Sequence, residues 1–474
     1  MGTQYSELLE VEGLKVKTPL DSDWDAYSLT YNRRVPAEPA IVILPYTSEQ
    51  VARAVRVAGG FEKPIQARSG GHSYASHSNG GVDGAVVIDL RYLQDIVLCD
   101  LGIVRVGGGV RLGKMALTIF QLGGLALAHG TCPGVGIGGH FTHGGFGFSS
   151  RAWGLAMDQI VALDVVTASG QIVRASDHEN TELFTAMRGA ADSFGIVVNF
   201  YLQTQPAPET ILKWTVDVPA AMRSVESAVE AFLHVQNFAN DASIVDRRLG
   251  FVVYLSHDRF SMEGTYLGDQ NAFTSNILPA LLRGFPEKEL TSVQLCNVDW
   301  LSSLRMFAGG TDLDVGDDDA EHAMFFSKCA VVSRPGLSGD ALKRYFEYIR
   351  DKGAIAPVGY FISMQLYGGA DSQITANTKD DAFAHRDAMW TIQHYAYATD
   401  VYAAVFPEEG MRFVEGLNNA LGAEHGAYNN YADPSLAPGE AQTLYYGEKL
   451  AKLKELKRKL DPGGVFSHPQ SIEP

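Results

Sequence analysis

Cysteine is scarce in this sequence, whose 474 residues hold only Cys99, Cys132, Cys296 and Cys329. No two of them form a Cys-x-x-Cys pair or a Cys/His spacing typical of zinc, so we expect neither a disulfide scaffold nor a metal site. An apolar run of about 18 residues, the length that a membrane-spanning helix needs, is also missing. These absences favour a globular protein that does not cross a membrane.

Positive charge is in deficit, because 38 Lys and Arg stand against 55 Asp and Glu and the formal net charge is −17. Such a chain repels phosphate backbones, which argues against nucleic acid and anionic membranes as partners. The one concentrated basic run, Lys449–Lys459, falls on a predicted helix, and we interpret it as a solvated face. Met1–Tyr5 shows no basic start followed by an apolar stretch, so no signal peptide is visible.

Several signatures of common enzymes are absent as well. The sequence has no Gly-Lys-Ser/Thr phosphate loop and no Gly-x-Ser-x-Gly elbow, which disfavours P-loop and serine hydrolase chemistry. Gly134–Gly139 does not open a helix after a strand as a dinucleotide fingerprint does. A nicotinamide-dependent enzyme is therefore disfavoured too.

Glycine, by contrast, is concentrated in Gly130–Phe148, which contains eight glycines. Glycine is used this densely where the backbone adopts positive φ or approaches a ligand closely. Successive amides in such a loop can form a concave nest for an anion, and Cys132 lies at its entrance. A second loop, Arg68–Tyr74, follows a predicted strand and carries Gly70-Gly71-His72. Taken alone, each loop has a structural alternative. Gly70-Gly71-His72 could be a tight turn capped by its histidine, and Cys132 could be a small buried hydrophobic residue.

The chain is too long for a single core, which predicts two domains. Short strands and helices with glycine-rich corners alternate over residues 1–205, as in an α+β or α/β nucleotide-binding domain. Longer helices and alternating strands fill residues 206–424, which indicates an antiparallel sheet covered by helices on one face. Residues 425–474 resemble residues 1–205 in pattern and include a helix with leucines on one face.

Together, Arg68–Tyr74 and Gly130–His140, with 60 residues from His72 to Cys132, resemble the vanillyl-alcohol-oxidase-type flavoproteins. Within them, the chain is similar to the berberine-bridge-enzyme-like branch, which includes the fungal oligosaccharide oxidases. The resemblance implies FAD attached covalently to His72 and Cys132. It also implies a two-domain α+β fold, with an FAD-binding domain from residues 1–205 and 425–474 and a substrate domain from 206–424.

The resemblance covers nearly the whole chain, including Gly144–Gly147, Trp153–Asp158 and Tyr428-Asn429-Asn430-Tyr431. It departs at Ala190–Gly195, where relatives carry a glycine-rich Gly-Gly-Asn-Phe-Gly. Further cofactor contacts are implied at Arg68, Ser69, Gly70, Gly71, Ser73, Val135, Gly136, Gly138, Gly139, His140, Gly195, Val197, Asn430 and Tyr431.

Oxidation of an alcohol by a flavin needs a base for the hydroxyl proton. The resemblance assigns this role to Tyr428, whose pKa would have to fall well below its reference of about 10. It also places Gln365 where the oligosaccharide oxidases have an assisting acid, and an amide cannot take a proton. Tyr74 and Gln393 are candidate substrate residues, because rings stack on sugar faces and amides bind hydroxyls.

By resemblance, a valine three residues after the attachment cysteine, here Val135, accompanies oxidase behaviour. We therefore expect oxygen as acceptor and hydrogen peroxide as product. The resemblance as a whole implies a secreted, monomeric oxidase that acts on a sugar or oligosaccharide at the anomeric carbon. Two alternatives stay open: a berberine-bridge-like oxidase of an aromatic alcohol or secondary metabolite, and a binding protein related to the family. The presence of Tyr428 with both attachment residues argues against the binding protein.

Overall fold

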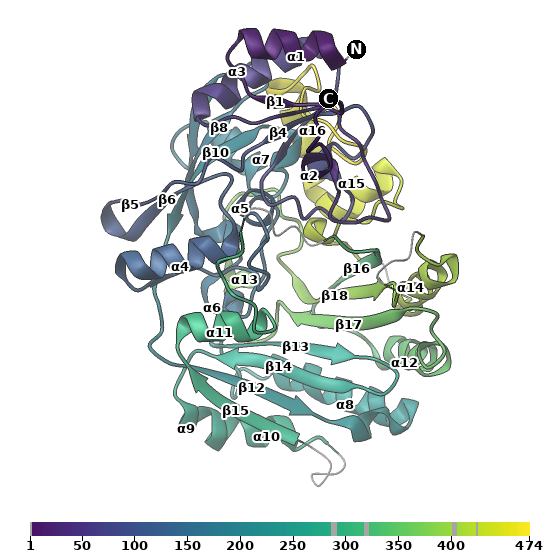
Figure 1. Cartoon of the computed structure of the whole chain (residues 1–474). Coiled ribbons are helices and arrows are strands. Elements are labelled where there is room, and N and C mark those ends of the chain that lie inside the picture. Colours follow the sequence, from purple (N-terminus) through teal and green to yellow (C-terminus); the bar gives the residue numbers. More distant parts are fainter. Residues whose placement is uncertain (1, 286–291, 317–321, 401–404, 423–424) are drawn as a thin grey trace.

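The computed structural model describes residues 2–285, 292–316, 322–400, 405–422 and 425–474 (Figure 1). Both termini lie at the same end of the molecule, where the first helix, α1 (Gly2–Val11), and the last, α16 (Leu450–Leu460), are found (Figure 1). The largest sheet lies at the opposite end. Within the described ranges, no helix has the length and apolar character needed to cross a bilayer.

A small mixed sheet begins the fold, in the order β1-β2-β4-β3. Its strands are β1 (Val16–Lys17), β2 (Ile41–Ile43), β3 (Ile65–Arg68) and β4 (Val86–Asp89). β4 pairs in parallel with both β2 and β3, which requires the crossover helix α3 (Ser48–Ala58) between them. The Thr47 side chain caps α3 by accepting the Gln50 N–H.

A second, antiparallel sheet has the order β5-β6-β10-β8-β9 and lies in the same part of the chain. Its strands are β5 (Ile96–Leu98), β6 (Ile103–Gly107), β8 (Ile160–Val166), β9 (Ile172–Ser176) and β10 (Ile196–Gln203). Helix α4 (Leu112–Gly123) ends at Gly124, whose φ of 61° is in the left-handed region that favours glycine. Short elements complete this part: α2 (Asp25–Ser28), β7 (Leu125–Ala126), α5 (Ile137–Thr142), α6 (Ser150–Trp153), α7 (Thr181–Met187) and β11 (Gln205–Pro206).

The third sheet has seven strands in the order β15-β12-β14-β13-β17-β18-β16, and all neighbours are antiparallel. The strands are β12 (Ile211–Asp217), β13 (Leu249–Leu255), β14 (Phe260–Tyr266), β15 (Ser292–Val298), β16 (Phe325–Ser333), β17 (Gly359–Leu366) and β18 (Ala388–Tyr397). Other helices in this part are α9 (Gln270–Ala272), α10 (Leu278–Leu282), α11 (Trp300–Phe307) and α13 (Gln373–Ala376).

Three long helices cover one face of this sheet: α8 (Val225–Asn240), α12 (Gly339–Gly353) and α14 (Glu408–Ala420). Met364 of β17 and Ile392 of β18 belong to one buried cluster with residues from all three helices. Because alternate strand residues point to opposite faces, the intervening residues, such as Gln365 and Gln393, point to the other face. That face is free of these helices and turns toward the glycine-rich loops.

The C-terminal segment returns to the first two sheets. This segment contains α15 (Pro438–Tyr446), which α16 follows. Beyond α16, Phe466 forms an isolated parallel β-bridge with Ile65 of β3. The prediction that Lys449–Lys459 is a solvated face is wrong at Lys457, which is fully buried. Its Nζ donates to Asp461 Oδ2 at 2.6 Å and to the carbonyl of Ser193 at 2.6 Å. This lysine therefore fastens the tail to the rest of the fold.

The predicted α+β fold class is confirmed, with one antiparallel sheet covered by helices on a single face. The boundaries at 205 and 425 stay a prediction, which the distribution of strands among the sheets supports. None of the four cysteines forms a disulfide.

Candidate cofactor and active site

The two glycine-rich loops cross in direct backbone contact. A Cβ built on Gly70 would lie 2.2 Å from the Gly136 nitrogen, and one on Gly136 would lie 2.0 Å from the Gly70 nitrogen. No side chain fits there, which is why both positions need glycine. The Ser69 hydroxyl joins the loops by accepting the Gly138 N–H at 3.2 Å and donating to the Gly108 carbonyl at 2.7 Å.

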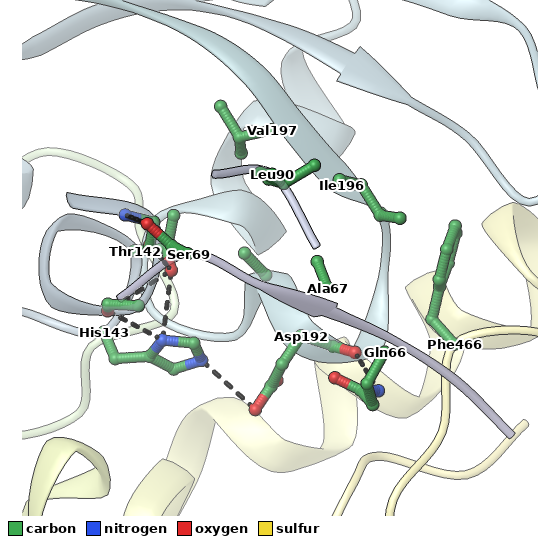
Figure 2. A pocket seen from close by; sticks show the side chains of 14 residues that line it. Gln66, Ala67, Ser69, Leu90, Thr142, His143, Asp192, Ile196, Val197 and Phe466 are labelled. Carbon is green, nitrogen blue, oxygen red and sulfur yellow. Dashed lines mark hydrogen bonds and ion pairs between the residues drawn. The ribbon is translucent and has the colours of Figure 1, made fainter. Parts of the chain in front are cut away.

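A cavity of about 80 Å³ opens beside this crossing (Figure 2). The lining includes the predicted contacts Ser69, Gly138, Gly139, Gly195 and Val197. It also includes Gln66, Ala67, Leu90, Thr142, His143, Ala191, Asp192, Ile196 and Phe466. Most of these are apolar or glycine, as expected for a pocket that takes a large flat ligand with a few polar contacts.

Two predicted cofactor contacts have structural partners instead. Arg68 is buried and forms an ion pair with Asp89, with an Nη2 to Oδ2 distance of 2.7 Å. It also donates to the Tyr27 carbonyl at 2.6 Å. The Ser73 hydroxyl accepts the His77 N–H at 2.9 Å and so closes its own turn. Neither side chain lines the cavity.

The two predicted attachment residues differ in exposure. The Cys132 side chain is exposed. Burial, assisted by the charges of Arg111 and His322, lowers the pKa of His72 to about 4. The ring is therefore neutral at ordinary pH and has a nitrogen lone pair. A Cβ on Gly134 would lie 3.2 Å from His72 Nε2, so the absence of a side chain at Gly134 leaves this face of the ring uncovered. A nucleophilic nitrogen and an accessible sulfur suit covalent attachment of a cofactor.

His140 has a different role in the same loop. Its Nε2 accepts the Gly130 N–H at 2.9 Å, and burial lowers its pKa to about 3. Asn430 donates to the His140 carbonyl at 3.3 Å and to the Tyr428 hydroxyl at 2.8 Å. Val135 is half-buried against the core of this part of the fold. These residues hold the glycine-rich loop in place.

Tyr428 is packed into that loop and is only 2% exposed. Its hydroxyl oxygen accepts the Gly145 N–H at 2.7 Å in addition to the Asn430 amide. Burial raises the pKa of Tyr428, although these hydrogen bonds oppose the shift. The expectation of a lowered pKa is therefore wrong. Gln365, the expected assistant of Tyr428, has a different partner.

That partner is Tyr431, whose hydroxyl oxygen accepts from Gln365 Nε2 at 2.7 Å. Burial also raises the pKa of Tyr431, and the Gln365 amide opposes the shift. Gln365 Oε1 is buried and makes no hydrogen bond within the described structure. The rings of Tyr428 and Tyr431 are nearly perpendicular, at 87°, with centroids 5.1 Å apart. The two tyrosines of one motif thus face different surroundings.

A second pair repeats the arrangement, because Gln393 Nε2 donates to the Tyr74 hydroxyl at 3.0 Å. The rings of Tyr74 and Tyr431 stack at 5.7 Å, so the two pairs are neighbours. Within β16, β17 and β18, register places further uncharged side chains on the same sheet face: Phe325, Ser327, Cys329, Phe361, Ser363, Thr391 and Tyr395. The site combines aromatic rings with amides and hydroxyls.

Sequence reasoning missed several residues of both regions. His143 and Asp192 line the cavity, and Tyr31 lies 4.6 Å from the His72 ring. Asp192 stands inside Ala190–Gly195, where the sequence departs from the family pattern, and that departure was the available signal. No motif in the sequence around Tyr31 indicates that it belongs to the site.

Comparisons with known proteins agree with this geometry. The family model for an FAD binding domain matches residues 39–176, and the model "Berberine and berberine like" matches residues 427–473. The chain is 33% identical to xylooligosaccharide oxidase of Thermothelomyces thermophilus, over 99% of this chain and 94% of that protein.

Solved structures are similar over the whole chain. A chitooligosaccharide oxidase superposes with a TM-score of 0.94 at 30% identity, covering 99% of both chains. Glucooligosaccharide oxidase from Acremonium strictum superposes with a TM-score of 0.93 at 30% identity, covering 99% of both chains. That structure is described as showing 6-S-cysteinyl, 8α-N1-histidyl FAD.

Proposed function

This chain belongs to the berberine-bridge-enzyme-like family of FAD-linked oxidoreductases, and from that we propose an oxidase that acts on the anomeric hydroxyl of a sugar or oligosaccharide. Oxygen is the proposed acceptor and hydrogen peroxide the product. The observation that carries the proposal is the pair of amide–tyrosine contacts, Gln365–Tyr431 and Gln393–Tyr74, on the sheet face that turns toward the loops of His72 and Cys132. Rings and amides are the groups that bind sugar faces and hydroxyls.

His72 and Cys132 would hold FAD through two covalent bonds. The neutral imidazole, the exposed thiol and the glycine cavity fit such a group, and a structural relative is described with cysteinyl and histidyl links. FAD, when bound, supplies the hydride acceptor and the route of electrons to oxygen. Half-buried Val135, three residues after Cys132, supports access of oxygen by family resemblance.

The hydroxyl proton would be handled by Tyr431 rather than Tyr428. The Tyr431 hydroxyl faces Gln365 on the sheet, whereas the Tyr428 hydroxyl already accepts from the Gly145 amide and the Asn430 side chain. Gln365 Oε1, which is buried and has no partner among the described residues, would accept a hydrogen bond from substrate. Gln365 thus orients the phenol and the substrate but takes no proton itself.

A second candidate function keeps FAD and changes the substrate to an aromatic alcohol. Two observations favour it: the acid of the oligosaccharide oxidases is absent at Gln365, and rings gather near His72. Phe325 and Tyr395 stack at 4.8 Å, and Phe361 and Tyr395 stack at 5.1 Å. An apolar, ring-lined wall would suit a flat aromatic substrate.

One experiment separates these proposals. Acid precipitation of the purified protein should leave the yellow colour in the pellet, and the His72→Ala/Cys132→Ala variant should release it into the supernatant. A panel of gluco-, xylo- and chitooligosaccharides and aromatic alcohols is then screened for hydrogen peroxide. Peroxide with sugars supports the first function, and peroxide with aromatic alcohols alone supports the second. A protein that carries no flavin contradicts both.

A further inference from the structure

Asp192 places a carboxylate in the wall of the cavity beside the glycine loops (Figure 2). Its side chain is 17% exposed, and it stands in the segment that departs from the family pattern. Its backbone carbonyl accepts from Gln66 Nε2 at 3.1 Å, which fixes the turn that carries it. A carboxylate in a pocket for a diphosphate needs a reason, because the two anions repel each other.

The first part of the reason is that His143 keeps the carboxylate ionised. His143 Nδ1 lies 3.1 Å from the Gly139 carbonyl, which only accepts, and Nε2 lies 3.3 Å from Asp192 Oδ2. Protonation of the ring would supply a proton on both nitrogens and would pair the ring with the carboxylate. Burial would lower the pKa of His143 and raise that of Asp192, but the pairing outweighs burial in both.

His468 completes the support from the other side. Its Nδ1 accepts the Gln470 N–H at 3.2 Å, so Nε2 carries the proton and donates to Asp192 Oδ2 at 3.0 Å. His77 stacks on the His468 ring at 3.8 Å. His77, Asp192 and His468 lie close enough to hold a metal ion. Metal binding would require the Nε2 lone pair of His468, however, and would break its bond to Gln470, so the geometry favours hydrogen bonding.

The carboxylate still has a free acceptor position. An ionised carboxylate offers about four lone-pair sites. His468 Nε2 donates to Oδ2, the His143 ring lies 3.3 Å from the same oxygen, and Ser193 Oγ donates to Oδ1 at 3.2 Å. One site on Oδ1 is left beside the cavity, and it binds only a donor. No lysine or arginine is among the described residues that line the cavity, so a diphosphate there would depend on backbone amides such as those of Gly138 and Gly139.

We propose that Asp192 binds a hydroxyl of the adenosine ribose of the dinucleotide. This rests on the proposed function, because FAD supplies the ribose. The cavity does not include His72 or Cys132, which would hold the flavin ring, so the cavity receives another part of the same ligand. In that part of the ligand, the diphosphate has no donor for an acceptor-only carboxylate, whereas the ribose hydroxyls and the adenine amine are donors. The ribose is bonded directly to the diphosphate, which the Gly138 and Gly139 amides of the same cavity would hold, so its hydroxyls are the nearer donors.

The test uses the full-length His72→Ala/Cys132→Ala variant, freed of flavin and titrated calorimetrically with ADP, 2′-deoxy-ADP and 3′-deoxy-ADP. These probes contain the ribose but no flavin or ribityl chain. Loss of the bound hydroxyl should weaken binding about tenfold, the usual effect of a hydrogen bond to a charged group. Adding Asp192→Asn should weaken the binding of ADP by a similar factor. It should also abolish the difference in affinity between ADP and the analogue that lacks the bound hydroxyl.

Asp164→Asn is the matched control, because Asp164 pairs with Arg174 at 2.7 Å in the same part of the fold but outside the cavity. It should leave the discrimination intact, and Asp192→Ser serves if the Asn variant does not fold. If the preference for ADP over the deoxy analogues is the same with and without the Asp192 carboxylate, the proposed role of Asp192 is overturned, and the proposed function is not affected. If the parent variant binds neither FAD nor ADP, the dinucleotide pocket and the proposed function fail together.

Discussion

Gln365 Nε2 donates to the hydroxyl oxygen of Tyr431 at 2.7 Å, and three residues earlier the Tyr428 hydroxyl is occupied by the Gly145 amide. The two tyrosines of one short motif therefore have separable tasks. Tyr431 faces the sheet on which a substrate would lie, and Tyr428 braces the glycine-rich loop.

This difference predicts opposite results for two conservative variants. Tyr431→Phe should lower kcat by about 10²- to 10⁴-fold, the usual contribution of a general acid–base group. Tyr428→Phe should mainly lower thermal stability and flavin content, because Gly145 and Asn430 lose their acceptor. Both are measured as turnover per bound flavin. If Tyr428→Phe loses turnover at full flavin content and Tyr431→Phe does not, the roles are reversed.

The pH dependence of turnover should be unusual for the same reason. Burial raises the pKa of Tyr431 above its reference of about 10. Below that pKa, the ionised fraction grows tenfold with each pH unit, so kcat/KM should keep rising through the alkaline range. Gln365→Glu should flatten the profile toward neutral pH, because a carboxylate can take the proton that an amide cannot. A wild-type plateau at neutral pH would contradict this assignment.

The crossing of the glycine loops predicts a severe effect from one added methyl group. Gly70→Ala would place its Cβ against the Gly136 backbone, which cannot move aside as a flexible side chain could. We expect a protein that carries little or no flavin and unfolds at lower temperature, measured by absorbance and calorimetry. Gly439→Ala is the control, because nothing lies within 4 Å of its Cβ. Normal flavin content in Gly70→Ala would show that the loops can separate.

The buried lysine predicts a large loss of stability. Lys457→Met would leave Asp461, whose side chain is fully buried, without its cation. Breaking a buried pair in this way costs about 3–5 kcal/mol, measured by denaturant unfolding. Lys459→Met, at an exposed position on the same helix, should change the free energy of unfolding by less than about 1 kcal/mol. Similar losses in both variants would mean that the Lys457 pair contributes nothing particular.

The His143–Asp192 pair should make stability depend on pH. Folding raises the pKa of His143 above its unfolded value of about 6.5. The stabilisation is therefore complete below about pH 6.5 and is lost as pH rises through the raised folded value. Asp192 works in the other direction, since its lowered pKa contributes above about pH 3.9 and is lost only in stronger acid.

The midpoint of thermal unfolding should accordingly differ most between wild type and His143→Gln at mildly acidic pH, and the gap should close in alkali. The variants are compared at equal flavin content, with His178→Gln as an exposed control. A gap that does not change with pH would show that His143 is neutral in the folded protein.

Much of the architecture could be predicted from local pattern. Threonine is a typical first cap residue, as Thr47 is for α3, and glycine a typical helix end, as Gly124 is for α4. β15 and β18 are harder to predict from local pattern. β18 is buried on both faces along most of its length and shows little polar alternation, and β15 is largely exposed on both faces as an edge strand.

The attachment residues and the cavity loops could be predicted from sequence, because dense glycine marks backbone that approaches a ligand or another loop closely. The choice between Tyr428 and Tyr431 was not, since it depends on which phenol meets Gln365 across two distant segments. Lys457 was missed because burial of one residue within a basic run depends on a partner tail that periodicity does not describe.

The alternation of β17 and β18 has a consequence for how this protein could change over generations. Met364 and Ile392 belong to the core under the helices, whereas their neighbours Gln365 and Gln393 face the site. Mutations at every second position can thus explore new substrates while the positions between them preserve folding. A library randomised at 363, 365, 391, 393 and 395 would sample specificity on an intact scaffold, which makes this sheet a natural starting point for divergence.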